Sequence, residues 1–156
     1  MDPKFADDLK FMSFAIEEAR LAYLDDEVPV GACIVCGGEV IARSHNTRER
    51  DRNAIRHAEI TAIEQACLAK QDRRLSDCTL YVTLEPCLMC TGALANARIG
   101  RVVYAAKDSI AGACGSIINT ALYPSGLRCE VVGGIMNDEA SSLLSSFFAK
   151  KREQNR

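Results

Sequence analysis

Two short segments, His57-Ala-Glu59 and Pro86-Cys87-Leu-Met-Cys90, constrain this chain more than any other part of its sequence. A β-forming run from Leu80 to Leu84 leads into Pro86, and small residues follow it, which predicts a strand and then a helix from Cys87 to about Asn96. Proline suits the opening of that helix because its missing N–H would have had no partner there. Cys87 and Cys90 are three positions apart, so both sulfurs lie on one helical face. The helix N-terminus favours the thiolate form there.

Paired thiolates are ligands for a soft divalent cation, and His57 can supply a third donor. Three protein ligands with a fourth position left for water form the catalytic zinc arrangement. Zinc bound in this way lowers the pKa of its water from about 15.7 to about 7. Glu59 follows His57 by two residues and is suited to take that proton. We therefore predict one Zn²⁺ held by His57, Cys87 and Cys90, with Glu59 as the proton carrier.

A Cys-x-x-Cys pair has two other interpretations, a redox pair and half of a structural zinc site. A redox pair would not require the His-x-Glu segment. A closed structural site would need a fourth Cys or His nearby, and His45 is the only other histidine. The complete pattern, His-x-Glu followed by Pro-Cys-x-x-Cys, resembles the signature of zinc-dependent deaminases. Catalytic zinc is the interpretation that uses every part of it.

Length and composition predict the general class of the protein. The chain has 156 residues, 48% of them hydrophobic and 26% charged, which is typical of one soluble globular domain spanning residues 1–156. The net charge of −2 means that nucleic-acid binding would have to rest on local basic patches. We find no secretory or membrane segment and expect a cytoplasmic protein. Its cysteines in apolar contexts are then expected to be buried free thiols: Cys33, Cys36, Cys67 and Cys78.

Hydrophobic periodicity predicts helices and strands along the whole chain. The expected helices are Lys4–Tyr23, His57 to about Leu68 (inner face Ile60, Ile63 and Ala66), Cys87 to about Asn96, Ser116–Leu122, and Asn137 to about Lys151. The expected strands are Glu27–Cys36 and Glu39–Ser44, joined by a hairpin at Gly37-Gly38, then Asp77–Thr83, Arg101–Ala106 and Leu127–Val132.

The order of these elements predicts an α/β fold, a three-layer α/β/α sandwich with a central five-stranded mixed sheet. The first strand is apolar throughout, which favours a central position. The strand-helix-strand unit around Cys87 predicts a parallel pair. Ligand sites in such sheets lie outside the carboxyl ends of the strands, where Glu85 to Cys90 falls.

Three further features have both a structural and a functional interpretation. Asn46 can offer a donor and an acceptor to a purine edge, but composition alone favours a turn residue bonded to its own backbone. The loop containing Arg48, Arg50, Arg52 and Arg56 is either solvated and self-paired or a phosphate-contacting rim. Phe148 lies off the inward stripe of the last helix, and a basic tail follows. Those cations complement the helix dipole, or they act with the aromatic ring in single-stranded RNA recognition.

From its first helix to Phe148 the chain resembles the bacterial tRNA-specific adenosine deaminases of the cytidine deaminase superfamily. Besides the zinc motif with its preceding strand, the resemblance rests on Glu27-Val-Pro-Val-Gly-Ala32, Ala42-Arg-Ser-His-Asn46, Ala97-Arg-Ile-Gly-Arg-Val-Val-Tyr104, Gly112-Ala-Cys-Gly-Ser116 and Leu144-Ser-Ser-Phe-Phe148. It implies the cytidine deaminase-like fold and hydrolytic conversion of adenosine to inosine at the wobble position (34) of a tRNA anticodon, on a flipped-out base. It also implies a homodimer with one zinc ion per subunit.

The resemblance assigns roles to individual residues. His57, Cys87 and Cys90 would bind zinc, and Glu59 would carry protons to the ring nitrogen and the leaving amine. Asn46 would hydrogen-bond the purine, and Phe148, Lys151 and Arg152 would lie near the RNA. Family members usually carry Asn-His-Arg before the last strand, whereas this chain reads Ser125-Gly-Leu-Arg128-Cys129, one residue shorter. That difference weakens the expectation of anticodon contacts from this loop.

Two other functions share much of this pattern. A free-base or nucleoside deaminase acting on guanine or cytosine would use the same zinc site in a small closed pocket. The net charge of −2 suits that function, while the basic tail argues against it. A catalytically inactive binding subunit would have lost the proton carrier, but Glu59 is present.

Overall fold

A mixed five-stranded sheet forms the centre of the molecule, with strand order β2-β1-β3-β4-β5. The computed structural model describes residues 1–156, and its strands are β1 (Gly31–Cys36), β2 (Glu39–His45), β3 (Cys78–Leu84), β4 (Arg101–Ala106) and β5 (Glu130–Val132). β1 pairs antiparallel with β2 and β3, whereas β3–β4 and β4–β5 are parallel. The predicted central position of the first strand is confirmed, because β1 has a neighbour on each side and is almost entirely buried.

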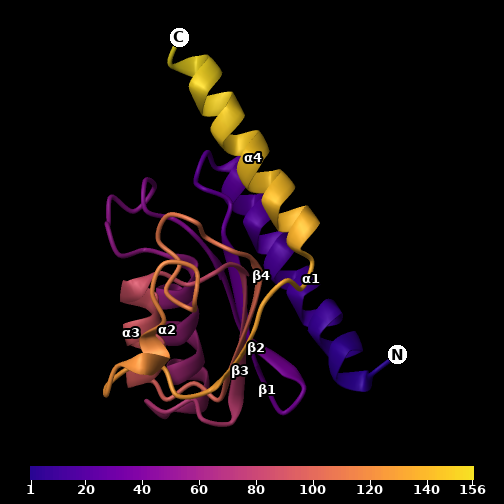
Figure 1. Ribbon diagram of the computed structural model, residues 1–156, viewed down its shortest axis with the longest axis vertical. Helices are drawn as coiled ribbons and strands as arrows, with labels where there is room; N and C mark the ends of the chain where they lie inside the picture. The colour runs from indigo at the N-terminus through magenta and orange to yellow at the C-terminus, as the bar shows by residue number, and fades with distance from the viewer.

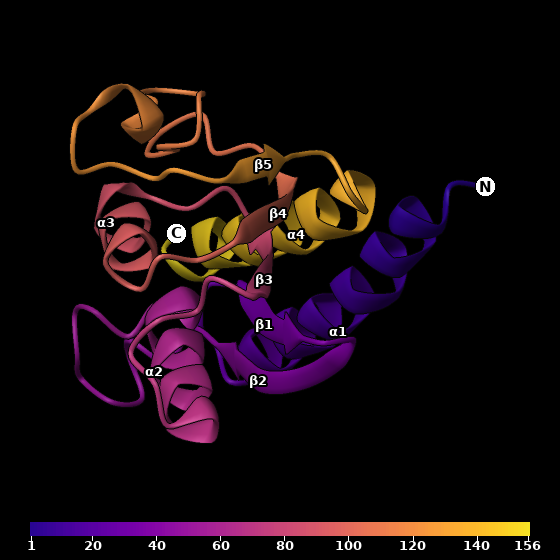
Figure 2. The same cartoon turned by 90° about the horizontal axis from the view of Figure 1, so that it is seen from below.

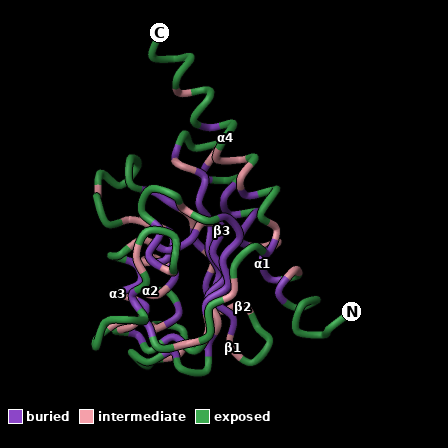
Figure 3. Tube along the Cα trace, viewed as in Figure 1, coloured by how far each residue is buried: buried purple, intermediate pink, exposed green.

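Four helices cover the two faces of this sheet. α1 (Pro3–Leu24) and α4 (Asn137–Gln154) lie on one face, while α2 (Ala58–Lys70) and α3 (Leu88–Asn96) lie on the other (Figure 1 and Figure 2). Each face has its own hydrophobic core, and buried residues follow the sheet through the middle of the molecule (Figure 3). The predicted three-layer α/β/α sandwich is therefore confirmed. The last turns of α4 extend past the sheet, so the C-terminus stands away from the body (Figure 1).

The hairpin between β1 and β2 turns at Gly37-Gly38, as predicted. Both glycines have positive φ values, 58° and 80°, which is the conformation of a type I′ turn. A side chain at either position would strain the backbone. The turn therefore fixes the register in which β2 returns beside β1.

Three predicted boundaries are wrong, two of them for identifiable reasons. The first strand begins at Gly31 and not at Glu27, because the Val30 N–H donates to the carbonyl of Val28 two residues earlier, at 2.8 Å, and closes a tight turn. The helix expected over 116–122 is only a 3₁₀ turn at Thr120–Leu122, since Ile117 and Ile118 donate their N–H groups back to Gly112. The last strand is shorter than predicted and covers only Glu130–Val132.

The inner face of α2 also differs from the prediction. Ile60 and Ile63 are only half-buried, while Ala58, Ala62 and Ala66 are fully buried together with Glu59. The small alanine side chains allow α2 to approach the sheet closely. Glu59, next to the buried Ala58, is buried between the helix and the sheet as well. The periodicity had indicated the bulkier residues because it weighs hydrophobic size.

Asp8 anchors α1 to the sheet through an ion pair that the sequence did not reveal. Its carboxylate accepts two hydrogen bonds from the Arg101 guanidinium, at 2.7 and 2.8 Å, and one from the Tyr81 hydroxyl at 2.8 Å. Burial by itself would raise the pKa of Asp8, but the hydrogen bonds from Arg101 and Tyr81 outweigh it and hold the pKa below 3.8. A depressed folded-state pKa stabilises the protein above the unfolded value, and the stabilisation is lost as pH falls through the folded value.

We expect Asp8→Ala to lower the free energy of unfolding by about 3 kcal/mol at neutral pH, because the largely buried Arg101 guanidinium would keep only its longer contact with the half-exposed Glu130, at 3.4 Å. Urea denaturation monitored by circular dichroism measures this difference. The matched control is Asp7→Ala, which removes an exposed carboxylate one residue away. The difference between the wild type and Asp8→Ala should shrink as the pH is lowered below 3.8. Equal stability of both variants at neutral pH would contradict the proposed anchoring.

Candidate active site

His57 and Glu59 reach the site through the N-terminus of α2. His57 is the N-cap residue of this helix, and Glu59 lies in its first turn. The hydroxyl of Ser44, on β2, donates to the carbonyl oxygen of Ala58 at 2.6 Å and so joins the helix start to the sheet. The position of the His-x-Glu segment is therefore set by the adjacent strand.

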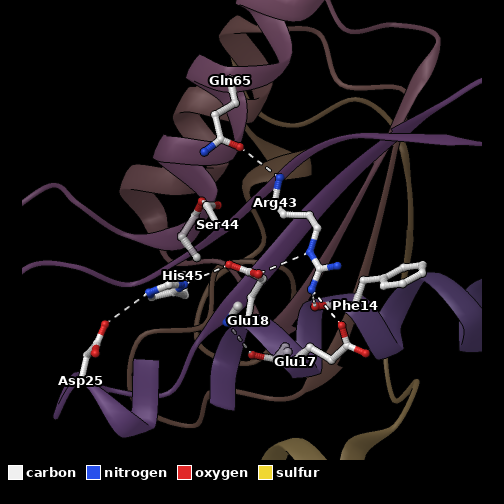
Figure 4. Close-up of polar contacts among 11 residues, drawn as sticks. Phe14, Glu17, Glu18, Asp25, Arg43, Ser44, His45 and Gln65 are labelled. Atoms are coloured by element: carbon white, nitrogen blue, oxygen red, sulfur yellow. Dashed lines mark hydrogen bonds and ion pairs between the residues drawn. The ribbon is translucent and has the colours of Figure 1, made fainter. Parts of the chain in front are cut away.

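A polar network around Glu18 supports the same strand from the other side. The Glu18 carboxylate lies 3.0 Å from His45 Nδ1 and 3.3 Å from Arg43 Nε, and Arg43 also pairs with Glu17 (Figure 4). This network joins α1 to β2. It also answers the question of a fourth zinc ligand, because His45 is held by Glu18 and is not part of the group around His57.

Cys87 and Cys90 converge on His57. Cys87 is the N-cap of α3 and Cys90 lies one turn later, so the helix begins one residue after the predicted position. His57 Nδ1 lies 3.6 Å from Cys87 Sγ and 3.5 Å from Cys90 Sγ. Tetrahedral zinc, with Zn–S of about 2.3 Å and Zn–N of about 2.05 Å, requires an N···S separation of about 3.6 Å. The three donor atoms are therefore already spaced to hold a zinc ion.

The electrostatics of this His-Cys-Cys group favour a cation. Hydrogen bonds from Cys90 and His57 lower the pKa of Cys87 to about 4, so this sulfur is a thiolate at neutral pH. The hydrogen bond to Cys87 and burial together raise the pKa of Cys90, since a second negative charge beside the first is unfavourable. A divalent cation would compensate both charges, and no fourth Cys, His, Asp or Glu completes the group.

Glu59 lies beside this group without belonging to it. The residue is only 4% exposed, and its carboxylate is not among the donor atoms that lie within 4.8 Å of one another. Burial raises the pKa of Glu59 to about 7. A carboxyl group with a pKa near the working pH can both accept and donate a proton, which is the property that general acid–base catalysis requires.

A cavity of about 160 Å³ opens directly in front of these groups. His57, Glu59 and Cys87 form one wall of it, and the other walls are formed by Val28, Val30, Asn46, Arg48, Ala58, Leu84, Glu85, Asp108 and Ala111. The Asn46 amide is fixed in orientation, because its Nδ2 donates to the Val28 carbonyl at 3.3 Å and its Oδ1 accepts from the Arg48 N–H at 3.1 Å. One N–H and one lone pair of this amide remain available to a ligand.

Glu85 holds one wall of the cavity, and sequence reasoning gave it no role. This 2% exposed carboxylate accepts the N–H groups of Asp108, Cys114 and Ser116 at 3.2, 3.0 and 3.1 Å. A Cβ at Gly112 would lie 2.5 Å from this carboxylate, which explains the glycine. An acidic residue directly after a buried strand, with a glycine-containing loop downstream, was the available signal.

Glu27 holds the loop before α2 in place in the same way, through hydrogen bonds to backbone N–H groups. Its 1% exposed carboxylate accepts the N–H groups of Glu49 and Arg50 at 3.0 and 2.8 Å. Two of the loop arginines fit the interpretation of a self-paired loop, since Arg50 pairs with Asp51 and Arg56 with Glu64. Arg48 instead lines the cavity, as the interpretation of a phosphate-contacting rim requires.

The predicted RNA-contacting residues lie on α4, outside the cavity lining. Phe148 is 45% exposed and stands edge-on to the buried Phe147, at 5.4 Å between ring centroids. Lys151 forms an ion pair with Asp26 at 2.6 Å, and Arg152 is exposed. Arg128, in the shortened loop, is exposed and donates to the carbonyls of Ala121 and Tyr123.

No helix in the structure is both long enough and apolar enough to span a membrane. All eight cysteines are free thiols. Of the four that were expected to be buried, Cys33 and Cys78 are buried, whereas Cys36 and Cys67 are only half-buried.

Comparison with known proteins places this site in a family. Residues 6–106 match the cytidine and deoxycytidylate deaminase zinc-binding region. The chain is 42% identical to the tRNA-specific adenosine deaminase of Bacillus subtilis over 147 residues, which cover 94% of this chain and 91% of that protein. A solved structure from a study of A-to-I editing by tRNA:A34 deaminases is 42% identical and superposes with a TM-score of 0.84, covering 86% of this chain and 99% of the other.

A guanine deaminase from Bacillus subtilis is more distant. It is 36% identical, with a TM-score of 0.60, and the match covers 69% of this chain and 66% of that one. The matches with the higher sequence identity are thus with the deaminases of tRNA. The chain belongs to the zinc-dependent cytidine and deoxycytidylate deaminase family, within its group of tRNA-specific adenosine deaminases.

Proposed function

We propose that this protein is a zinc-dependent tRNA adenosine deaminase that converts adenosine to inosine at the wobble position (34) of an anticodon by hydrolysis. The observation that carries the proposal is the His57, Cys87 and Cys90 group, spaced for zinc, beside a buried Glu59 that is free to move protons. Relatives that are about 40% identical over nearly the whole chain are tRNA-specific adenosine deaminases.

The proposed chemistry assigns a separate task to each side chain. His57, Cys87 and Cys90 hold the zinc, which when bound makes its water acidic enough to yield hydroxide at neutral pH. Glu59 would take one proton from that water and give it to the ring nitrogen of the purine. It would then carry the second proton of the same water to the departing amine, so that ammonia leaves. Asn46 orients the base with its remaining N–H and lone pair.

The RNA itself is proposed to extend over the rim of the cavity. A target base must leave its stack to enter so small a pocket. The exposed Phe148 ring and the Arg152 side chain are then available for base stacking and phosphate contact where α4 extends beyond the body (Figure 1). Lys151 contributes its charge only if the ion pair with Asp26 opens.

An assay of several substrates with the zinc-loaded protein tests this function. We expect inosine from a stem-loop RNA with adenosine at position 34, and no ammonia from free guanine or cytosine. Affinity for the stem-loop should fall steeply as salt increases, because phosphate contacts release counterions. Rapid deamination of a free base with no inosine in the RNA would instead support the guanine or cytosine deaminase alternative, for which a related guanine deaminase provides the precedent.

Asn46→Ala is expected to lower kcat/KM for the stem-loop by about 10–100-fold, which corresponds to about 1–3 kcal/mol for an unpaired polar contact in a binding site. Zinc content should not change, because Asn46 is not in the His-Cys-Cys group. Asn53→Ala, in the exposed loop before α2, is the matched control and should retain full activity. Loss of zinc in Asn46→Ala would show that this residue supports the metal site and does not read the base.

A homodimer is also proposed, on the basis of an apolar surface beside α3. Leu88, Ile117, Leu122 and Tyr123 are each more than half exposed, and a groove of about 370 Å³ runs between α3 and the 3₁₀ turn. Gly92 has no neighbour within 4 Å of where a Cβ would lie, so another subunit could approach the helix backbone closely. Contiguous exposed apolar surface of this kind marks protein–protein contacts.

Sedimentation equilibrium tests the dimer. The wild-type protein is expected at twice the chain mass of 17.0 kDa. Leu88→Glu should shift it to the monomer, since a charge at the centre of the apolar surface opposes association. Leu24→Glu is the control, because Leu24 is 80% exposed at the end of α1 on the opposite face of the sheet. A wild-type protein that sediments as a monomer would contradict the proposal.

The remaining proposals concern the chain as a whole. We propose that residues 1–156 act as one deaminase domain, because α1 and α4 pack on each other and on the same sheet that positions the zinc ligands. A cytoplasmic location is proposed from the free thiols, and subcellular fractionation tests it.

A further inference from the structure

Two cysteines lie opposite each other on neighbouring inner strands, at the ends of these strands that are remote from the zinc ligands. Cys36 is the last residue of β1 and Cys78 is the first of β3, and they are direct partners in the antiparallel register. The zinc-binding cysteines follow the opposite end of β3. This pair therefore has no part in the proposed deamination.

The backbone hydrogen bonds show which type of antiparallel pair Cys36 and Cys78 form. The Cys78 N–H donates to the Leu75 carbonyl, and the Cys78 carbonyl accepts from the Gly100 N–H, so both groups point away from β1. Cys36 and Cys78 are thus a non-hydrogen-bonded pair, for which the Cα atoms lie about 4.5 Å apart and the side chains approach closely. Disulfides require Cα separations of about 4.4–6.8 Å.

The two thiols also point to the same place. Cys36 Sγ donates to one oxygen of the Asp77 carboxylate at 3.4 Å, and Cys78 Sγ contacts the other oxygen at 3.5 Å. All these donor atoms lie within 4.8 Å of one another. Both sulfurs are therefore on one side of the sheet, as a covalent bond between them would need.

We propose that Cys36 and Cys78 form a reversible disulfide, a redox modification site separate from the deaminase centre. The oxidant is a low-molecular-weight disulfide of the glutathione class. Cys36, half-buried, is the accessible thiol and attacks first to form a mixed disulfide, releasing one small thiol. Cys78, only 1% exposed, then attacks the Cys36 sulfur and releases the second. Two protein thiols become one S–S bond, and the oxidant gains the two electrons and two protons as two small thiols.

Metal binding is the other chemistry that two thiols and a carboxylate allow. The Lys70 ammonium already pairs with the Asp77 carboxylate and neutralises it. A cation would have to displace this ammonium group, whereas disulfide formation leaves the ion pair intact. The contacts therefore favour a covalent link between the sulfurs.

Differential alkylation and peptide mass spectrometry of the zinc-loaded full chain test the proposal. The protein is equilibrated with oxidised and reduced glutathione at a series of ratios. We expect a Cys36–Cys78 cross-linked peptide that appears with oxidising ratio and disappears on return to reduced glutathione. Deamination of the stem-loop should change less than twofold. Cys36→Ser and Cys78→Ser should each abolish the cross-link, while Cys67→Ser, which alters a half-buried thiol on α2, should leave it unchanged.

Three results would overturn the proposal. One is a stable glutathione adduct on Cys36 with Cys78 still free, which would show that the sulfurs cannot meet. Another is the absence of any modification at either residue under oxidising conditions. The third is a second bound zinc ion in the wild-type protein that Cys36→Ser removes, which would identify the cluster as a metal site.

Discussion

Glu59→Gln is expected to reduce kcat for adenosine deamination by about 10²–10⁴-fold while the protein keeps its zinc, because the variant removes a proton carrier and not a ligand. The amide has nearly the shape of the carboxylate, so the buried position in α2 should remain filled. It cannot accept a proton from water or return one to the leaving amine. Turnover of the stem-loop and metal content by mass spectrometry measure the two effects separately.

The control for this variant is Glu64→Gln, which alters an exposed carboxylate on the same helix. Its activity should match that of the wild type. Should Glu59→Gln lose zinc together with activity, the carboxylate would have to be counted among the groups that hold the ion. Full activity in this variant would mean that another group moves the proton.

Cys87→Ala is expected to lose zinc and activity together. Even the loss of an outer-shell partner costs about 10–100-fold in metal affinity, so removal of a direct ligand should weaken zinc binding by more than about 100-fold. Only His57 and Cys90 would remain, and two ligands do not fix a tetrahedral ion. Dialysis against a weak chelator, followed by metal analysis and activity assay, measures both losses.

Cys67→Ala provides the matched control, since it removes a half-buried thiol from α2 without touching the His-Cys-Cys group. It should retain one zinc ion and full turnover. Undiminished activity of Cys87→Ala without bound metal would exclude the ligand role of Cys87 and with it the proposed chemistry.

The convergence of the zinc-binding residues could be predicted from the sequence because each belongs to a regular local pattern. Pro86 and the cysteine spacing indicated a helix start. The hairpin glycines indicated that β1 pairs with β2, and the apolar first strand indicated its central position. Helix starts and the carboxyl ends of strands meet at one edge of such a sheet. Local pattern and chain topology together were sufficient to bring His57 and Cys87 to one place.

The walls of the cavity could not be predicted in the same way. Glu27 and Glu85 are buried carboxylates that bind backbone N–H groups of loops up to 31 residues away in sequence. Composition and periodicity treat such residues as surface groups, because isolated acidic residues usually are exposed. The backbone N–H groups that stabilise a buried carboxylate can be identified only when the positions of the loops are known.

The strand order has a consequence for how the protein responds to its metal. His57 arrives through β2 and α2, and the cysteines arrive through β3, so the donors meet only when β3 is paired with β1. An ion bound at this point would add a further link between these two parts of the chain, beside the pairing of β1 with β3 and the contact between α2 and α3. Occupancy and folding therefore reinforce each other, and scarcity of zinc would shorten the lifetime of the protein as well as silence it.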